Sequence, residues 1–315
     1  MKGIGILLVL TCHFFGWNHS WLSNTINSFH MPMFFIIAGY FSKSYVDRVT
    51  TWVSVKKYFN RLYWPFVFIQ ILLVGWCLLM VFAKGESFNP AISNFLSIFW
   101  ADVYGPTTPW GRLSIGVVWF LIALLVAKIL LVPLSRCGKW SLPLSVVLGG
   151  IAILLHKVFP YSIWCISLSL TALPFVTLGW WIRQYGLPMW CKIITIIAWP
   201  LAIIFSKMDM YGMMWTCYPL DLLGACGGTY VTYVLSRTIA NGGGRIISEV
   251  FSYLGRISLA IMCFHCFEMA SHLGNHIWAF IGWESQTWVW WVWRYVLTIL
   301  LAIAVTKIPL IKKLF

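Results

Sequence analysis

Charged residues are scarce in this chain. Asp, Glu, Lys and Arg make up 10% of its 315 residues, and 8 residues in all are acidic. Soluble domains carry about 25% charged residues, whereas 61% of this sequence is hydrophobic and its mean hydropathy is +0.84. The composition excludes an ordinary soluble domain and predicts an all-α polytopic membrane protein.

The sequence also gives no sign of a signal-peptide cleavage site, a metal site or a disulfide framework. No small-residue cleavage site follows the first apolar segment, so we expect this segment to be kept as a helix and not removed as a signal peptide. Cys263-x-x-Cys266 encloses His265 but has no second ligand pair, and we therefore expect no metal site. The nine cysteines lie nearly all inside apolar segments, which favours a packing role over a disulfide framework.

Basic residues, by contrast, are in excess. The 22 lysines and arginines give the chain a net charge of +14. They stand singly or in small clusters at the ends of apolar segments, where membrane topology requires them, so we expect a lipid bilayer and no nucleic acid as partner. The positive net charge can also attract a polyanionic cytosolic ligand such as a coenzyme A thioester.

The apolar segments predict about ten spanning helices in one transmembrane domain, residues 1–315. We expect these helices at about 3–18, 29–44, 62–83, 115–134, 142–157, 162–182, 190–206, 214–236, 254–273 and 287–307. The stretch from Lys43 to Arg61 is strongly basic, so the positive-inside rule places it in the cytoplasm together with both chain termini. In this topology 17 of the 22 lysines and arginines fall inside or in the inner halves of helices.

Two regions of this topology are less regular. The segment 142–157 is short and is interrupted by Pro143 and Gly149-Gly150, which favours a tilted or partly re-entrant helix. The longest external piece, residues 84–113, is rich in Pro, Asn, Thr and aromatic residues. Together with the polar turn 18–28, this loop is expected to shape the site of an external substrate.

A histidine lies where the bilayer should hold no ionisable group. His13 follows Lys2 by eleven residues, about 16 Å along a helix. If Lys2 lies near one membrane face, His13 lies roughly half-way across a hydrocarbon core of about 30 Å. A polar group at that depth is costly and usually functional. The alternative is a neutral histidine that is hydrogen-bonded between packed helices.

The N-terminal motifs resemble a known family. Lys2-x10-His13, the run from Phe29 to Phe35 and Gly39-Tyr40-Phe41 are similar to the membrane acyltransferase family 3, and most closely to its sugar O-acetylase branch. The spacing of a basic residue and a histidine is the most specific of these motifs. The resemblance implies acetyl-CoA as the donor substrate, with no permanently bound cofactor, and a glycan or polysaccharide as the acceptor.

Weaker motifs continue the resemblance through most of the chain, in the order that the family has them. They are Arg61-Leu62-Tyr63-Trp64-Pro65, Trp119-Phe120-Leu121, Leu173-Pro174-Phe175 with Leu178-Gly179, the run from Tyr253 to Leu259, and Phe264-His265. Many members of the family carry a second arginine where this chain has Trp64, so the role of that arginine does not transfer to this sequence.

Acyl transfer to a hydroxyl needs a base, a group that orients the base, and cations that hold the phosphates of the donor. His13 is our candidate base, with Glu268 or Asp221 as the orienting carboxylate and Lys2 and Arg61 on the phosphates. His265 and Glu268 are three residues apart and therefore share one helix face. Together with His30, His265 is a second candidate for proton transfer or for a hydrogen bond to substrate.

These residues leave alternatives open. The same polar groups also suit a structural cluster that pairs helices, or an inert subunit. A transporter is the competing functional class, although no two matched helices are broken by Gly or Pro in the two halves of the chain. A covalent acyl-histidine and direct transfer are both compatible with the sequence. We expect a multi-pass protein of the cell (inner or plasma) membrane, and a homo-oligomer stays open.

Overall fold

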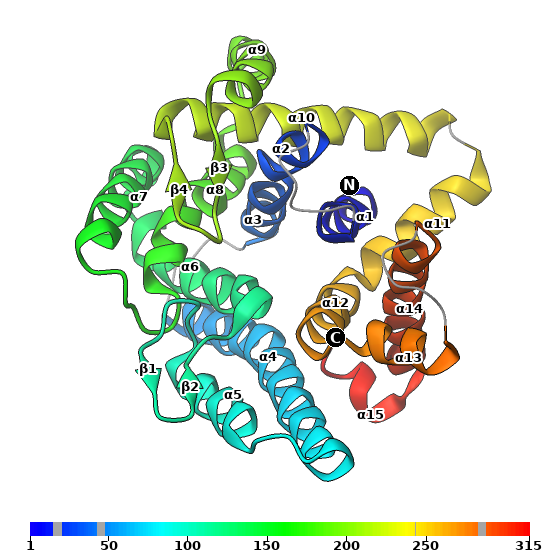
Figure 1. Cartoon of the computed structure of the whole chain (residues 1–315). Helices are drawn as coiled ribbons and strands as arrows, with labels where there is room; N and C mark the ends of the chain where they lie inside the picture. The colour runs from blue at the N-terminus through cyan, green and yellow to red at the C-terminus, as the bar shows by residue number, and fades with distance from the viewer. Residues whose placement is uncertain (15–20, 43–47, 243, 283–287) are drawn as a thin grey trace. The chain divides into compact units, whose positions relative to one another are not determined.

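The computed structural model describes residues 1–14, 21–42, 48–242, 244–282 and 288–315 (Figure 1). These residues form helices joined by short connections, together with two hairpins of two-residue strands. The all-α fold class is therefore confirmed. The chain divides into two compact units, each of which is built from separate stretches of the sequence.

The first unit comprises residues 1–58, 123–160 and 166–256. Its complete elements are α1 (Lys2–Phe14), α2 (Trp21–Asn27), α3 (His30–Tyr40), η2 (Gly138–Trp140), α7 (Ser141–Val158), α8 (Ile166–Tyr185), α9 (Met189–Phe205), β3 (Met208–Asp209), β4 (Met214–Trp215), α10 (Tyr218–Gly242) and α11 (Arg245–Arg256). Helix α8 packs against both α3 and α7, and α9 packs against the long helix α10 (Figure 1).

The second unit comprises residues 59–122, 161–165 and 257–315. Its complete elements are α5 (Asn89–Trp100), β1 (Thr107–Thr108), β2 (Gly111–Arg112), η1 (Gly116–Val118), α12 (Ser258–Ser271), α13 (Leu273–Ile281), α14 (Trp288–Lys307) and α15 (Pro309–Lys312). Helices α4 (Arg48–Lys84) and α6 (Trp119–Ser135) contribute residues to both units. Within the second unit, α12 packs against α14.

Among the described residues, five helices are long and apolar enough to cross a membrane. They are Thr51–Lys84, Gly116–Ser135, Gly138–Val158, Ile166–Tyr185 and Val289–Lys307, and α11 with α12 adds a sixth if the two form one broken span. Helices α1 and α9 are apolar but shorter. The expected count of ten and the cytoplasmic termini stay predictions.

The helix boundaries correct several expectations from the sequence. The expected helix 254–273 is broken at Ile257, and the preceding stretch, expected to be a loop, forms α11. Ile246, Val250 and Tyr253 recur there at helical spacing, a period that the neighbouring glycines and charges obscured.

The expected loop 84–113 contains α5 and a hairpin, and α4 begins at Arg48 instead of about residue 62. Helix α2 fills most of the expected turn 18–28, whose residues 18–20 lie outside the described residues.

The expected interruption of the segment 142–157 is wrong. Helix α7 runs without a break from Ser141 to Val158. Pro143 lies in its first turn, where a missing N–H costs no helical hydrogen bond. Residue 149 must be glycine because Tyr218 packs against it: an added Cβ would lie 2.2 Å from the hydroxyl oxygen of Tyr218. That hydroxyl donates a hydrogen bond to the carbonyl of Val146 at 3.0 Å.

A buried carboxylate joins two loops of the second unit. Asp102 is fully buried and accepts hydrogen bonds from the hydroxyl of Ser162 and from the backbone N–H of Val103, the latter at 2.7 Å. The backbone N–H of Trp164 donates to the carbonyl of Trp100 at 2.9 Å. These contacts hold the segment 161–165 against the end of α5.

The two glycines of α7 give a matched test of this packing. We expect Gly149→Ala to lower the free energy of unfolding by about 1–3 kcal/mol, because the methyl group displaces the Tyr218 hydroxyl from its hydrogen bond. Gly150→Ala is the control, since its Cβ would lie 3.5 Å from the Tyr218 ring, an ordinary contact. Thermal unfolding in detergent measures both variants, and equal melting temperatures for the two would contradict the packing.

Asp102 gives the stability a pH dependence. Burial is the largest influence on its carboxyl and raises the pKa above the ordinary value of 3.8, although the hydrogen bonds from Ser162 and Val103 lower it in part. The folded state then binds the proton more tightly than the unfolded state. The resulting gain in stability is complete below 3.8 and is lost as the pH rises through the raised pKa, with a slope of at most about 1.4 kcal/mol per pH unit.

Asp102→Asn removes this titration and keeps the shape of the side chain. We expect the melting temperature of the wild-type protein to rise, relative to that of Asp102→Asn, as the pH falls toward 3.8. At neutral pH we expect the variant to lose about 1–3 kcal/mol, because asparagine has a single acceptor oxygen, so that one of the two donors, Ser162 or Val103, meets the N–H₂ group instead. Parallel melting curves across this pH range would show that Asp102 is not titrating in the folded protein.

Candidate functional site

The predicted site residues divide between the two units. Lys2, His13, His30 and Asp221 belong to the first unit, and the second unit contains Arg61, His265 and Glu268. Three of the seven, Lys2, His13 and Arg61, are partly or fully exposed, and the remaining four are buried.

His30 is held in one tautomer at the start of α3. Its Nδ1 lies 2.8 Å from the backbone carbonyl oxygen of Ile26. A carbonyl can only accept a hydrogen bond, so Nδ1 carries the proton and the lone pair of a neutral imidazole is on Nε2. Pro32 follows in the first turn of α3, where the helix needs no N–H from it. The motif from Phe29 to Phe35 thus begins a helix and fixes its histidine at the same place.

Two aromatic contacts fix the chain just before His30. Phe29 meets Trp199 of α9 edge-on, with ring centroids 5.3 Å apart, and the Trp199 indole N–H donates to the Ser28 hydroxyl at 3.0 Å. On the side of α10, Gly228 leaves room for the Phe29 ring, which would lie 2.5 Å from an added Cβ. Helices α9 and α10 therefore position the start of α3.

Glycines bring α3 and α8 into backbone contact. An added Cβ on Gly39 would lie 1.9 Å from the carbonyl oxygen of Val176, and one on Gly179 would lie 2.0 Å from that of Ile36. Small residues at such positions let membrane helices pack closely. The glycines of two sequence motifs, Gly39-Tyr40-Phe41 and Leu178-Gly179, are therefore explained by one helix contact.

His13 lies near the end of α1, close enough to His30 for the two imidazoles to interact electrostatically. The preceding residue ties α1 to α2, because the Cys12 thiol donates a hydrogen bond to the side-chain oxygen of Asn27 at 3.0 Å. At the other end of α1, an added Cβ on Gly3 would lie 2.1 Å from the carbonyl oxygen of Phe251 in α11. Both ends of the helix are thus fixed, and two of the predicted histidines lie in one neighbourhood.

The two predicted phosphate ligands belong to different units. The ammonium group of Lys2 lies 6.0 Å from the centroid of the Phe41 ring, within the first unit. Arg61 is exposed on α4. Exposure suits a group that must meet a soluble ligand, and the role of both residues stays a prediction.

The carboxylate of Asp221 is hydrogen-bonded at the N-terminus of its own helix, α10. Its carboxylate accepts a hydrogen bond from the backbone N–H of Cys217 at 3.2 Å, and the Ser206 hydroxyl is a further partner. A carboxylate that bonds back to a free N–H in the first turn of a helix is a common capping arrangement. These contacts favour a structural role for Asp221 at the start of α10.

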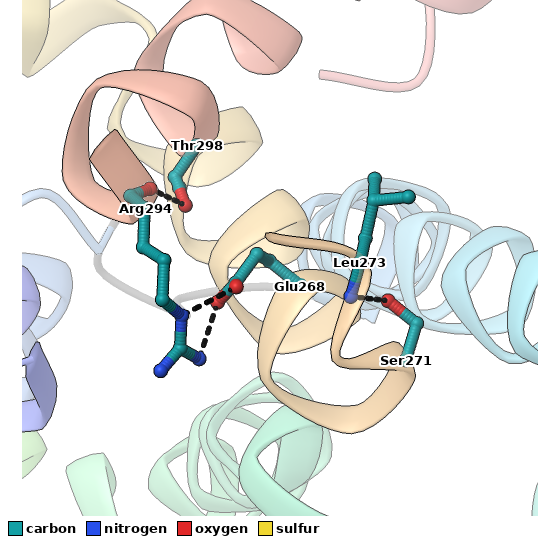
Figure 2. Close-up of polar contacts among 5 residues, drawn as sticks. All are labelled: Glu268, Ser271, Leu273, Arg294 and Thr298. Atoms are coloured by element: carbon teal, nitrogen blue, oxygen red, sulfur yellow. Dashed lines mark hydrogen bonds and ion pairs between the residues drawn. The ribbon is translucent and has the colours of Figure 1, made fainter. Parts of the chain in front are cut away.

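His265 and Glu268 lie one turn apart on α12, exposed to 1% and 0% respectively. Glu268 forms a double ion pair with Arg294 of α14 (Figure 2). The distances are 2.6 Å from Nε to Oε1 and 2.9 Å from Nη2 to Oε2. Arg294 is not among the site residues predicted from the sequence. The available signal was the need of a carboxylate inside an apolar segment for a partner of opposite charge.

Among the described residues, no group of three or more His, Cys, Asp and Glu side chains could hold a metal ion. Cys263 and Cys266 are both buried free thiols.

The tautomer of His30 can be tested through stability. We expect His30→Ala to lower the free energy of unfolding by about 0.5–1.5 kcal/mol, because it removes the side-chain donor of the Ile26 carbonyl, which keeps the backbone N–H of Phe29 at 3.3 Å. His30→Asn should recover much of this loss, since its amide N–H₂ reaches about as far as Nδ1. His30→Gln, which places its amide near Nε2 instead, is the control. Equal melting temperatures for the Asn and Gln variants would contradict the assignment.

The comparisons with known proteins give one match. The family model of the acyltransferase domain matches residues 1–307. No curated protein and no solved structure matches the chain significantly. The match includes all seven predicted site residues, and with several helices apolar enough to span a bilayer it identifies a multi-pass membrane acyltransferase. The chain belongs to acyltransferase family 3.

Proposed function

We propose that this protein is an integral-membrane O-acyltransferase that moves an acetyl group from cytosolic acetyl-CoA to a hydroxyl of a glycan or cell-surface polysaccharide. The observation that carries the proposal is the family membership together with two interacting histidines, His13 and His30, on helices α1 and α3. Imidazole suits the deprotonation of a sugar hydroxyl at neutral pH because its ordinary pKa lies near neutrality. No observation favours the transporter alternative.

In the proposed reaction His13 is the general base. Its imidazole takes the proton of the acceptor hydroxyl while the oxygen attacks the thioester carbonyl carbon. The carbon–sulfur bond then breaks, and the imidazolium returns the proton to the departing thiolate of coenzyme A. The fixed tautomer of His30 supports its role as a second group, because the lone pair on Nε2 can accept a hydrogen bond from substrate or from His13.

Two carboxylates are candidates for orienting a histidine. Asp221 is engaged with backbone and hydroxyl donors at the start of α10. Glu268 uses one lone pair on each oxygen for Arg294, which leaves each oxygen able to accept a further hydrogen bond. Glu268, with His265 one turn away on the same helix, is therefore the better candidate.

The donor and the acceptor meet from opposite sides in this proposal. Lys2 and Arg61 bind the phosphates of acetyl-CoA at the cytoplasmic face, and the pantetheine arm reaches into the helices. The acceptor approaches from outside, past the region 84–113, which contains α5 and the β1–β2 hairpin. We therefore propose the cell membrane as its location, because cytosolic thioester and external glycan are both within reach there.

Replacement of His13 tests the proposal. We expect His13→Ala to reduce acetyl transfer by a factor of about 10²–10⁴, the usual contribution of a general base. The measurement uses membranes that contain the full-length protein, radiolabelled acetyl-CoA, and recovery of label in the glycan fraction of the expressing cells.

His276→Ala is the matched control for this experiment. His276 lies outside the predicted site, on α13, where its Nδ1 accepts a hydrogen bond from the Lys84 ammonium at 3.2 Å. We expect its replacement to leave transfer unchanged. Full transfer by His13→Ala at normal protein level would reject the catalytic assignment, and absence of label with the wild-type protein would reject the proposed function itself.

A further inference from the structure

The ion pair between Glu268 and Arg294 is almost completely buried. Glu268 is 0% exposed and Arg294 is 8% exposed. Both oxygens of the carboxylate are engaged by the planar guanidinium, which fixes the orientation of the carboxylate as well as its position (Figure 2). A lysine could supply the charge but not this two-point contact.

The surroundings of the pair are built to hold the guanidinium in place. Its central carbon lies 4.9 Å from the centroid of a Trp290 ring and 5.7 Å from that of Trp291, so the cation lies near two aromatic faces of its own helix. One turn further along α14, the buried Thr298 hydroxyl donates to the backbone carbonyl of Arg294 at 3.0 Å. The side chain thus has little freedom to leave the carboxylate.

A glycine after the end of α12 leaves space for the pair. Helix α12 ends where His272 adopts a left-handed conformation with φ of 51°. The turn that follows is closed by the Leu273 N–H, which donates to the Ser271 hydroxyl at 3.2 Å (Figure 2). It brings Gly274 against the ion pair, where an added Cβ would lie 2.7 Å from Oε1 of Glu268 and 2.9 Å from Cγ of Arg294.

Stability alone does not explain such an arrangement. A buried ion pair is generally no more stabilising than a well-packed apolar pair of similar volume, because both charges must leave water. Here three separate features, the two-point contact, the tryptophan rings and Gly274, constrain where the carboxylate points. His265 lies one turn before Glu268 on the same face of α12.

We propose that Arg294 is a positioning residue, which holds the Glu268 carboxylate at a fixed place and orientation on α12, beside His265, for the transfer reaction. This inference rests on the proposed function. Arg294 touches no substrate in this role and acts through Glu268. Gly274 is the small residue that allows the carboxylate and the guanidinium to meet.

A charge-reversed pair separates this role from a purely structural one. Arg294→Gln leaves a buried carboxylate without its partner, and we expect it to lower both the melting temperature and kcat. The double variant Glu268→Arg/Arg294→Glu restores an ion pair between α12 and α14 but moves the carboxylate to α14. We expect it to recover the melting temperature while kcat for acetyl transfer stays lower by on the order of 10²-fold, with KM for acetyl-CoA unchanged.

Two milder variants keep the test decisive if the double variant does not fold. Arg294→Lys keeps the charge, and we expect it to fold normally with a reduced kcat and an unchanged KM. Gly274→Ala displaces the carboxylate without removing any charge, and we expect the same pattern. Gly75→Ala on α4 is its control, because the added Cβ meets no atom of the described residues within 4 Å apart from the adjacent backbone of its own helix.

The outcomes are distinct. Wild-type kcat in the charge-reversed protein, or in both Arg294→Lys and Gly274→Ala, would overturn the positioning role and leave the pair as a structural contact. A wild-type protein that transfers no acetyl group and releases no coenzyme A from acetyl-CoA would instead contradict the proposed function, and with it this role. A fall in kcat at constant KM in the variants, with active wild-type protein, supports both.

Discussion

The first unit depends on the approach of two helices to within backbone contact. Where α3 and α8 meet, Gly39 and Gly179 each face a carbonyl oxygen of the opposite helix. Inside a bilayer, apolar side chains gain little by leaving lipid, so helices associate through close packing and hydrogen bonds. The contact sets the position of α3 and therefore of His30. The packing of α9 and α10 around Phe29 secures the other end of the same helix.

The buried polar groups described above find their hydrogen-bond partners in two ways. His30, Asp102 and Asp221 each bond to a backbone group a few residues away, and the hydroxyls of Ser162 and Ser206 add a second partner to the two carboxylates. Glu268 is different, because its partner comes from another helix, 26 residues further along the chain. Local partners fix a side chain wherever its own segment goes, whereas the Glu268 pair forms only if α12 and α14 pack correctly. The ion pair therefore depends on the tertiary packing of two helices and not on the conformation of one helix alone.

The sequence alone predicts the fold class and most of the helices, because long apolar runs between charged ends leave few alternatives. It fails at α11, where a helix with polar and apolar residues on different faces was mistaken for a loop next to Gly242 and Gly244. It also fails at α7, because Pro143 and Gly149 look like helix breakers until the first turn and the Tyr218 contact are known. Motifs identified the candidate residues, but the tautomer of His30 and the partner of Glu268 depend on contacts that no spacing reveals.

The interleaving of the two units has a consequence for biosynthesis. The second unit needs residues 257–315, which are made after all residues of the first unit. Helix α12 therefore leaves the ribosome with its carboxylate before α14 can supply the guanidinium. An acidic residue costs an inserting helix at most about 2.5–3.5 kcal/mol, the value at the helix centre, and Glu268 lies in the last turn of α12. The pair with Arg294 offsets this cost, so a message truncated before codon 288 would yield an α12 that is held less firmly than in the longer chain.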